Sequence, residues 1–349
     1  MDMHTQQEKA SILLIYTGGT IGMIENPETG VLESFNFQHL KDNMPELKKL
    51  GYSVATIQFD PPMDSSEMGP DSWMKIVKII ADNYQKYDGF VVLHGTDTMS
   101  YTASALSFML ENLSKPVILT GSQLPIGMLR TDGKENLITA IEIAAAKENG
   151  LPLVPEVCIF FENDLLRGNR TSKINADNFN AFRSYNYPAL AHAGIYIKYD
   201  LPQVYHPVSR KPLKPHYLLD RNIAILKLFP GISPQVVESI LNIPGLKGVV
   251  METFGSGNAP CEEWYVVLRS TALIGVTFDQ DFNARALAQV AGVGIQQISV
   301  LTLDIVTVER EVDHVVTLQC FELLTHLLFR GQHAVGAAGL YTAHAVGHT

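Results

Sequence analysis

The chain has 349 residues, of which 46% are hydrophobic and 18% are charged, and its formal charge at pH 7 is -10. This length and composition are typical of a globular protein with two domains and exclude a largely disordered chain. The negative charge and the lack of Lys/Arg clusters argue against nucleic acid as a partner, because binding to a phosphate backbone needs concentrated positive charge.

The first predicted strand is an apolar run at residues 11–16, which ends in the glycine turn Thr-Gly-Gly-Thr at residues 17–20. Residues 52–59 alternate as a strand does, and an amphipathic helix is predicted to open at Asp71. The run 89–94 predicts a second buried strand, which ends at a turn containing Thr96 and Asp97. The elements that follow are helices at 100–111 and 136–147 and strands at 116–120 and 157–161.

Strands that alternate with helices predict an α/β fold whose larger N-terminal domain has a mainly parallel sheet flanked by helices. Four prolines at residues 201–220 predict a connection between domains. A strand at 222–229 and a helix at 233–241 then begin a smaller C-terminal α/β domain. The predicted division is therefore 1–200, 201–220 and 221–349.

Three features of the sequence bear on compartment and cofactors. Cys158, Cys261 and Cys320 are odd in number and far apart, which predicts free thiols. The polar first ten residues and the lack of a long apolar run predict no signal peptide and no membrane span, and so favour the cytoplasm. The histidines are scattered and no cofactor motif is present, so we expect neither a metal nor an organic cofactor.

Polar turns at the carboxyl ends of parallel strands are the expected place for a ligand site. The turn at 17–20 lacks the lysine of a phosphate loop and the spacing of a dinucleotide site, which lowers the prediction of a dehydrogenase. Thr96 and Asp97, like Ser65 and Ser66, could simply cap a helix, although adjacent hydroxyls and free N–H groups also suit a small carboxylate. Lys173 lies either in a solvated loop or, beside a Thr–Asp pair, where a desolvated amine could act as a base.

These segments together resemble the bacterial L-asparaginase family, closest to its cytoplasmic type I branch. Residues 14–22 (LIYTGGTIG) and 89–99 (GFVVLHGTDTM) are similar to the two signature segments of the family. Residues 64–68 (DSSEM), 120–123 (TGSQ) and 167–173 (RGNRTSK) match in residue and order. The resemblance implies cleavage of the side-chain amide of L-asparagine to L-aspartate and ammonia, by a homodimer or homotetramer.

The resemblance also assigns roles. It implies that Thr20 is the nucleophile and that the second catalytic group consists of Thr96, Asp97 and Lys173. It places substrate binding at Ser65, Ser66, Glu67, Thr96 and Asp97, with the serines on the α-carboxylate and Asp97 on the α-ammonium. A threonine hydroxyl needs a base before it attacks, and the oxyanion needs preorganised donors, for which the N–H groups of the second Gly-Thr turn are candidates.

Three departures from the family pattern keep other functions open. Val31 stands where type I members usually have a tyrosine, and Glu252 stands where cooperative members have an arginine that binds a regulatory asparagine. The chain beyond Pro260 matches poorly. The alternatives are a catalytically weak or inactive amino-acid-binding protein and an amidohydrolase that also accepts glutamine, since one methylene is worth only about 1–3 kcal/mol.

Overall fold

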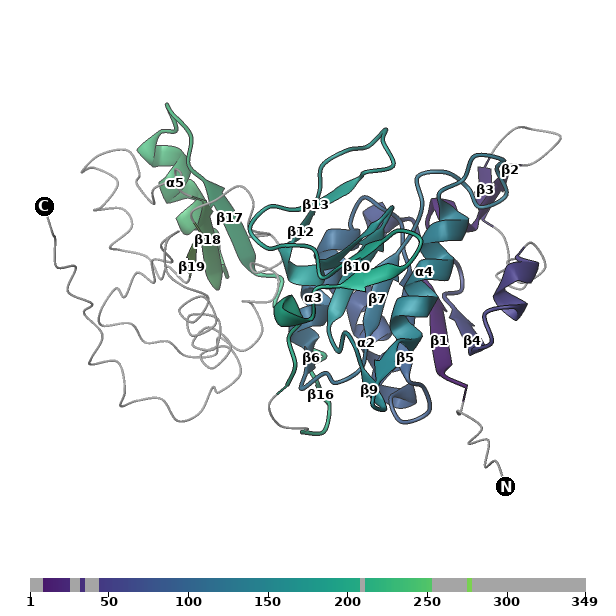
Figure 1. The fold of residues 1–349 in the computed structure, drawn as a ribbon. Coiled ribbons are helices and arrows are strands. Elements are labelled where there is room, and N and C mark those ends of the chain that lie inside the picture. The colour runs from purple at the N-terminus through teal and green to yellow at the C-terminus, as the bar shows by residue number, and fades with distance from the viewer. Residues whose placement is uncertain (1–8, 26–31, 35–43, 208–210, 253–274, 278–349) are drawn as a thin grey trace, which may run out of the picture. The chain divides into compact units, whose positions relative to one another are not determined.

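The computed structural model describes residues 9–25, 32–34, 44–207, 211–252 and 275–277. The described residues fall into two compact units, which part between Leu218 and Leu219. The larger unit is built on an eight-stranded sheet (Figure 1). Its strands, in spatial order, are β15 (Ile197–Tyr199), β14 (Ala191–Ala193), β11 (Asp164–Arg167), β10 (Val157–Phe161), β7 (Val117–Thr120), β5 (Gly89–Leu93), β1 (Ser11–Tyr16) and β4 (Ser53–Gln58).

The central part of this sheet is parallel. Strands β4, β1, β5, β7 and β10 pair in parallel, whereas β11, β14 and β15 extend the sheet in antiparallel fashion. All residues of β5, β7 and β10 are buried, as expected of strands that are covered on both faces. The predicted α/β class with a mainly parallel sheet is confirmed.

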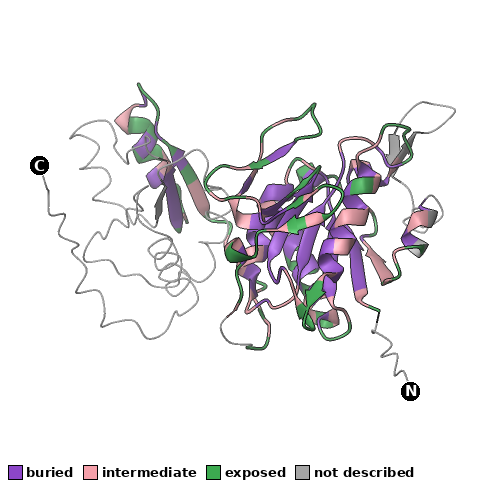
Figure 2. Ribbon diagram, in the orientation of Figure 1, coloured by how far each residue is buried: buried purple, intermediate pink, exposed green. Residues whose placement is uncertain are grey.

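Among the described residues, the helices that cover the sheet are α2 (Pro70–Asn83), α3 (Met99–Met109) and α4 (Gly133–Ala145). Helix α4 packs in one buried cluster with Ile12, Leu14 and Tyr16 of β1, a cluster to which α2 and α3 contribute no residue. Figure 1 shows helices on both sides of the sheet, and Figure 2 shows that their inner faces are buried.

The helix predicted at 100–111 ends two residues early because its last residues leave as a strand. Leu110–Glu111 (β6) pairs with Lys214–Pro215 (β16), a segment that lies more than 100 residues later in the chain. The helix predicted at 136–147 likewise ends at Ala145, because Lys147–Glu148 (β8) pairs with Leu151–Pro152 (β9). Both differences arise from short strand pairs that carry no periodic pattern.

The larger unit also has short elements between these strands and helices. They are the 3-10 helices η1 (Thr20–Gly22), η2 (Pro45–Lys48), η3 (Ser65–Glu67), η4 (Gly168–Arg170) and η5 (Leu201–Gln203), and the strand pairs β2 (Met23–Glu25) with β3 (Leu32–Ser34) and β12 (Thr171–Lys173) with β13 (Phe182–Ser184).

The segment predicted to connect the domains is held to the larger unit. Glu156 accepts two hydrogen bonds from Arg167, from Nε at 2.6 Å and Nη2 at 3.0 Å, and a third from the Tyr205 amide. Arg167 also donates to the Gln203 carbonyl at 3.0 Å. The chain that leaves the sheet is therefore tied to it by a partly buried ion pair.

The smaller unit has a parallel sheet of β17 (Ile223–Lys227), β18 (Gly248–Glu252) and β19 (Gly275–Thr277), together with helix α5 (Pro234–Leu241). Its own core contains Leu226, Val237, Val249 and Met251. The strand predicted at 222–229 and the helix at 233–241 correspond to β17 and α5. Val31, Cys261, Cys320 and the poorly matching chain after Pro260, apart from residues 275–277, lie outside the described residues.

Candidate active site

Four parallel strands end in register at one edge of the sheet. Tyr16 of β1 aligns with Gln58 of β4 and with Leu93 of β5, and Leu93 aligns with Thr120 of β7. The chain continues this alignment into the turns, because the Thr17 amide and hydroxyl both donate to the Leu93 carbonyl, at 3.0 Å and 2.8 Å. The polar segments that follow these strands are therefore brought to one place.

Glycines allow three of these segments to approach one another closely. A Cβ on Gly19 would lie 2.5 Å from the amide nitrogen and 2.6 Å from the Cα of Gly95. A Cβ on Gly95 would in turn lie 2.5 Å from the Ser65 hydroxyl oxygen. Gly19 has φ of 93°, a conformation that also favours glycine. The turns that carry Thr20, Thr96 and Ser65 thus form one layer, in which neither Gly19 nor Gly95 has room for a side chain.

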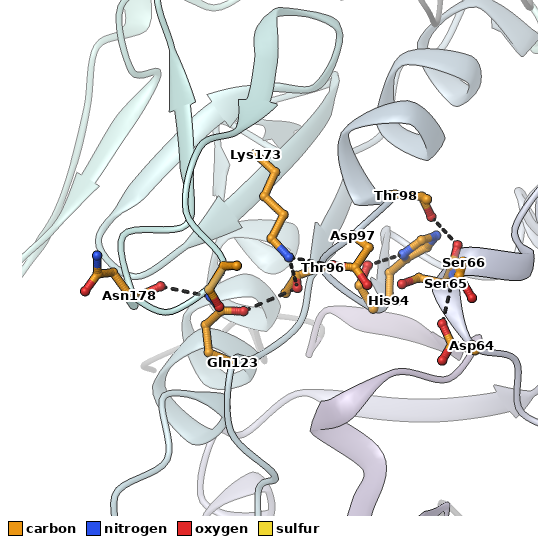
Figure 3. A network of polar contacts seen from close by, with 12 residues as sticks. Asp64, Ser65, Ser66, His94, Thr96, Asp97, Thr98, Gln123, Lys173 and Asn178 are labelled. Carbon is orange, nitrogen blue, oxygen red and sulfur yellow. Dashed lines mark hydrogen bonds and ion pairs between the residues drawn. The ribbon is translucent and has the colours of Figure 1, made fainter.

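Lys173, at the end of β12, joins this layer. Its Nζ donates to the Thr96 hydroxyl at 2.9 Å and to Asp97 Oδ1 at 2.7 Å (Figure 3). The Lys173 side chain is 17% exposed and that of Asp97 is 67% exposed. The lysine is thus held beneath the surface beside a hydroxyl, with a carboxylate that is open to solvent.

Gln123, the last residue of the matching segment 120–123, contacts the hydroxyl that Lys173 contacts. Its Nε2 donates to the carbonyls of Ala176 and Asn178, both at 2.9 Å. Because those carbonyls only accept, Oε1 is the atom that faces Thr96, whose hydroxyl donates to it at 3.3 Å (Figure 3). The Thr96 hydroxyl therefore accepts from Lys173 and donates to Gln123. The sequence signal that could have identified Gln123 is its position three residues after the end of the parallel strand β7.

The predicted carboxylate site is the 3-10 helix η3. Ser65 is buried and Ser66 and Glu67 are exposed. The Ser66 amide donates to Asp64 Oδ1 at 2.8 Å, and Thr98 donates its hydroxyl to the Ser65 carbonyl at 2.6 Å. These bonds fix η3 against the start of α3, with both serines beside the Gly95 turn (Figure 3).

Thr20 opens η1 and is half-buried. It follows Gly19 directly, as Thr96 follows Gly95, so the two threonines are adjacent to the glycines that touch. Its hydroxyl forms no hydrogen bond to any described residue.

Two alternatives were open for the cations of residues 167–173, and the solvated loop does not describe Arg167 or Lys173. Arg167 is paired with Glu156 and lies over the Tyr187 ring, 4.2 Å from its centroid. Lys173 is in a strand and points at Thr96. Within the described ranges, no three His, Cys, Asp or Glu side chains gather as a metal ion would require. None of the described helices is long and apolar enough to cross a bilayer.

Comparison with known proteins agrees with this geometry. A family model described as "Asparaginase, N-terminal" matches residues 11–205. The chain is 46% identical over 255 residues to L-asparaginase 1 of Escherichia coli (strain K12), covering 72% of this chain and 73% of that protein. It is 43% identical to the 60 kDa lysophospholipase of Mus musculus, of which it spans 47%. The crystal structure of L-asparaginase I from Vibrio cholerae superposes with a TM-score of 0.68 at 42% identity, covering 75% of this chain and 77% of that one.

Proposed function

The chain belongs to the asparaginase family, and on that basis we propose that it hydrolyses the side-chain amide of L-asparagine to L-aspartate and ammonia. The observation that supports this most directly is the contact of the half-buried Lys173 with both Thr96 and Asp97, beside the glycine layer that carries Thr20. No cofactor is needed for the reaction, because each step is a proton transfer or an attack by oxygen.

In the proposed mechanism a base takes the Thr20 hydroxyl proton as the Thr20 oxygen attacks the amide carbon. That proton is passed to the leaving nitrogen as the C–N bond breaks, so that ammonia leaves and an acyl-threonine ester remains. Water then attacks the ester and releases aspartate. The backbone N–H groups of the Gly95–Thr96 turn are proposed to stabilise the oxyanion of each tetrahedral intermediate, where preorganised donors have their greatest effect. Thr96 and Lys173 are proposed as the base system, with Asp97 orienting the lysine amine.

The substrate's charged groups are proposed to bind at the rim of the same layer. The Asp97 side chain is exposed, so its carboxylate is hydrated in the free enzyme and accessible to the α-ammonium group of the substrate. Ser65 and Ser66 are proposed to hold the α-carboxylate. The next residue, Glu67, is proposed as a further substrate-binding residue. This division puts opposite charges of the amino acid on two different turns, which would orient its side-chain amide.

The test is a coupled ammonia assay on the wild type, Thr20→Ala and Thr96→Val, with asparagine and glutamine as substrates. We expect release from asparagine by the wild type and a loss of about 1000-fold or more in each variant, because both hydroxyls take part in the reaction. Ligand-dependent thermal stabilisation without ammonia would instead support the amino-acid-binding alternative. Comparable kcat/KM for the two amides would support a dual substrate, and a lysophospholipid included as a third substrate should remain intact.

Near-normal turnover by Thr20→Ala would eliminate Thr20 as nucleophile. Circular dichroism of both variants should match that of the wild type, because neither side chain lies in the core. A loss of activity together with a loss of fold would not support the assignment.

Four broader features belong to the same proposal. We propose a cytoplasmic enzyme that assembles as a dimer or tetramer, which sedimentation equilibrium would measure. Domains at 1–200 and 221–349, joined by 201–220, would be tested by limited proteolysis. Glu252 forms an ion pair with Lys227 at 3.2 Å, so no cation is proposed there for a regulatory asparagine, and hyperbolic kinetics are expected.

A further inference from the structure

His94, the last residue before the Gly95 turn, is held in a buried chain of hydrogen bonds that the mechanism above does not use. Its side chain is fully buried, as are those of Trp73 on α2 and Thr102 on α3. His94 Nδ1 lies 2.7 Å from the Gly95 carbonyl oxygen, and His94 Nε2 lies 2.8 Å from the Thr102 hydroxyl. Trp73 Nε1 donates to that same hydroxyl at 2.9 Å.

The direction of donation along this chain is determined by its two ends. A carbonyl oxygen only accepts, so His94 Nδ1 carries the proton that bonds to Gly95. Nε2 of a neutral ring is then an acceptor, and the Thr102 hydroxyl donates to it. The indole N–H only donates, which fills the acceptor side of Thr102. All three hydrogen bonds of the chain are therefore formed when His94 is the neutral tautomer with its proton on Nδ1.

The protonation state agrees with this arrangement. Burial lowers the pKa of His94 to about 4. The ring is therefore neutral at physiological pH, and it has one donor and one acceptor for its two partners.

The chain of hydrogen bonds ends on the peptide that the mechanism needs. A planar trans peptide directs its C=O and its N–H to opposite sides. Holding the Gly95 carbonyl therefore also holds the N–H of Thr96 in one direction. Within the described residues, this N–H donates to no other group, so it is free to meet a ligand.

We propose that His94 is a positioning residue that locks the Gly95–Thr96 peptide so that the Thr96 N–H is fixed as an oxyanion donor. The inference rests on the proposed function, because it assigns a cause to the orientation of a donor in that same site. Trp73 and Thr102 act one step further back, by holding the imidazole in the tautomer that donates from Nδ1.

The substitutions that test this differ in which ring nitrogen they imitate. The amide nitrogen of Asn can occupy the place of Nδ1, whereas the amide of Gln reaches the place of Nε2. We expect His94→Leu and His94→Gln to lower kcat about 10- to 100-fold, less than the loss of a whole oxyanion donor. KM for asparagine should stay within about twofold, because the ground-state amide needs this donor less than the oxyanion does. His94→Asn should retain kcat within about fivefold of the wild type.

A stability control separates positioning from general loosening. Ile143→Ala removes buried volume from α4, in a cluster to which α2 and α3 contribute no residue, and should lower Tm while leaving kcat unchanged. The inference is overturned if His94→Leu keeps wild-type kcat. It is equally overturned if His94→Asn is as impaired as His94→Leu, since that would show that the donor at Nδ1 is not what matters.

A second measurement does not depend on activity. In 15N NMR spectra of the wild type at pH 7, the His94 ring should be neutral with its proton on Nδ1. A proton on Nε2 would overturn the inference even if the enzyme is active. Absence of ammonia release by the wild type, with the Nδ1 tautomer present, would count against the proposed function and leave the locked peptide established.

Discussion

At the scale of single residues, the part of the chain that the structure describes contains a histidine, His94, whose charge state is coupled to folding. The buried His94 has a pKa of about 4, compared with 6.5 for an ordinary histidine, because burial disfavours its charged form. Between pH 6.5 and 4 the side chain of His94 is protonated in the unfolded chain but neutral in the native protein. Stability should therefore be complete above pH 6.5 and should fall as the pH drops through this window.

The expected slope is of the order of 1 kcal/mol per pH unit, measured as the free energy of unfolding in denaturant at pH 7, 6 and 5. His94→Asn removes the titrating ring and should flatten the part of the slope that this group causes. His206→Asn, which removes an exposed histidine, is the matched control for the loss of a histidine as such. Equal slopes in wild type and His94→Asn would contradict the prediction.

Gln123 carries a prediction of its own at this scale. Gln123→Met keeps the length of the side chain but removes the acceptor of the Thr96 hydroxyl and both donors to the segment after Lys173. We expect kcat/KM to fall about 5- to 10-fold, since the one lost bond that involves a reacting group, that of the Thr96 hydroxyl, is worth about 1 kcal/mol. Steady-state kinetics would measure it, with the exposed Gln235→Met as control. Unchanged kcat/KM would show that Thr96 needs no such acceptor.

At the scale of elements, the sequence predicted some strands closely and missed others entirely. Strands β1, β5, β7 and β10 are apolar runs that end in polar or glycine turns, so periodicity and punctuation locate them within a residue or two. Strand β11 ends at the start of the segment 167–173, and β12 forms its end. The three cations of this segment interrupt the apolar pattern by which a buried strand is predicted. Arg167 is accommodated there only because Glu156 lies beside it in the folded sheet, a partner that local pattern does not reveal.

The same distinction holds within the site. Thr20, Thr96, Asp97 and Lys173 were assigned through resemblance to a family, and the structure places three of them in direct contact. The supporting chain from Trp73 to His94 was missed because no local pattern connects His94, although it lies in the signature segment 89–99, with Trp73 or Thr102. A tryptophan and a threonine 29 residues apart become partners only when α2 and α3 pack together. Supporting groups of this kind require knowledge of tertiary contacts.

At the scale of the whole molecule, the chain's exit from the larger sheet depends on the Glu156–Arg167 pair. Its side chains are only 9% and 17% exposed, so Glu156→Gln leaves a cation with little access to water. We expect the free energy of unfolding to fall by about 2–4 kcal/mol, measured by denaturant titration. Lys214→Met breaks a pair with Glu111 whose side chains are 59% and 40% exposed, and should cost less than about 1 kcal/mol. Equal losses in the two variants would contradict the prediction.

The parallel sheet has a consequence for how the protein reaches its working state. Thr96 and Lys173 are 77 residues apart, and they meet only after β5, β7 and β10 have been aligned across long crossovers. Topologies of this kind fold slowly, because the entropy cost of closing long loops is incurred before the stabilising contacts between distant strands form. Enzymatic competence should therefore return late during renaturation, well after helical circular dichroism has recovered. A newly synthesised chain would remain catalytically silent until its central strands are in place.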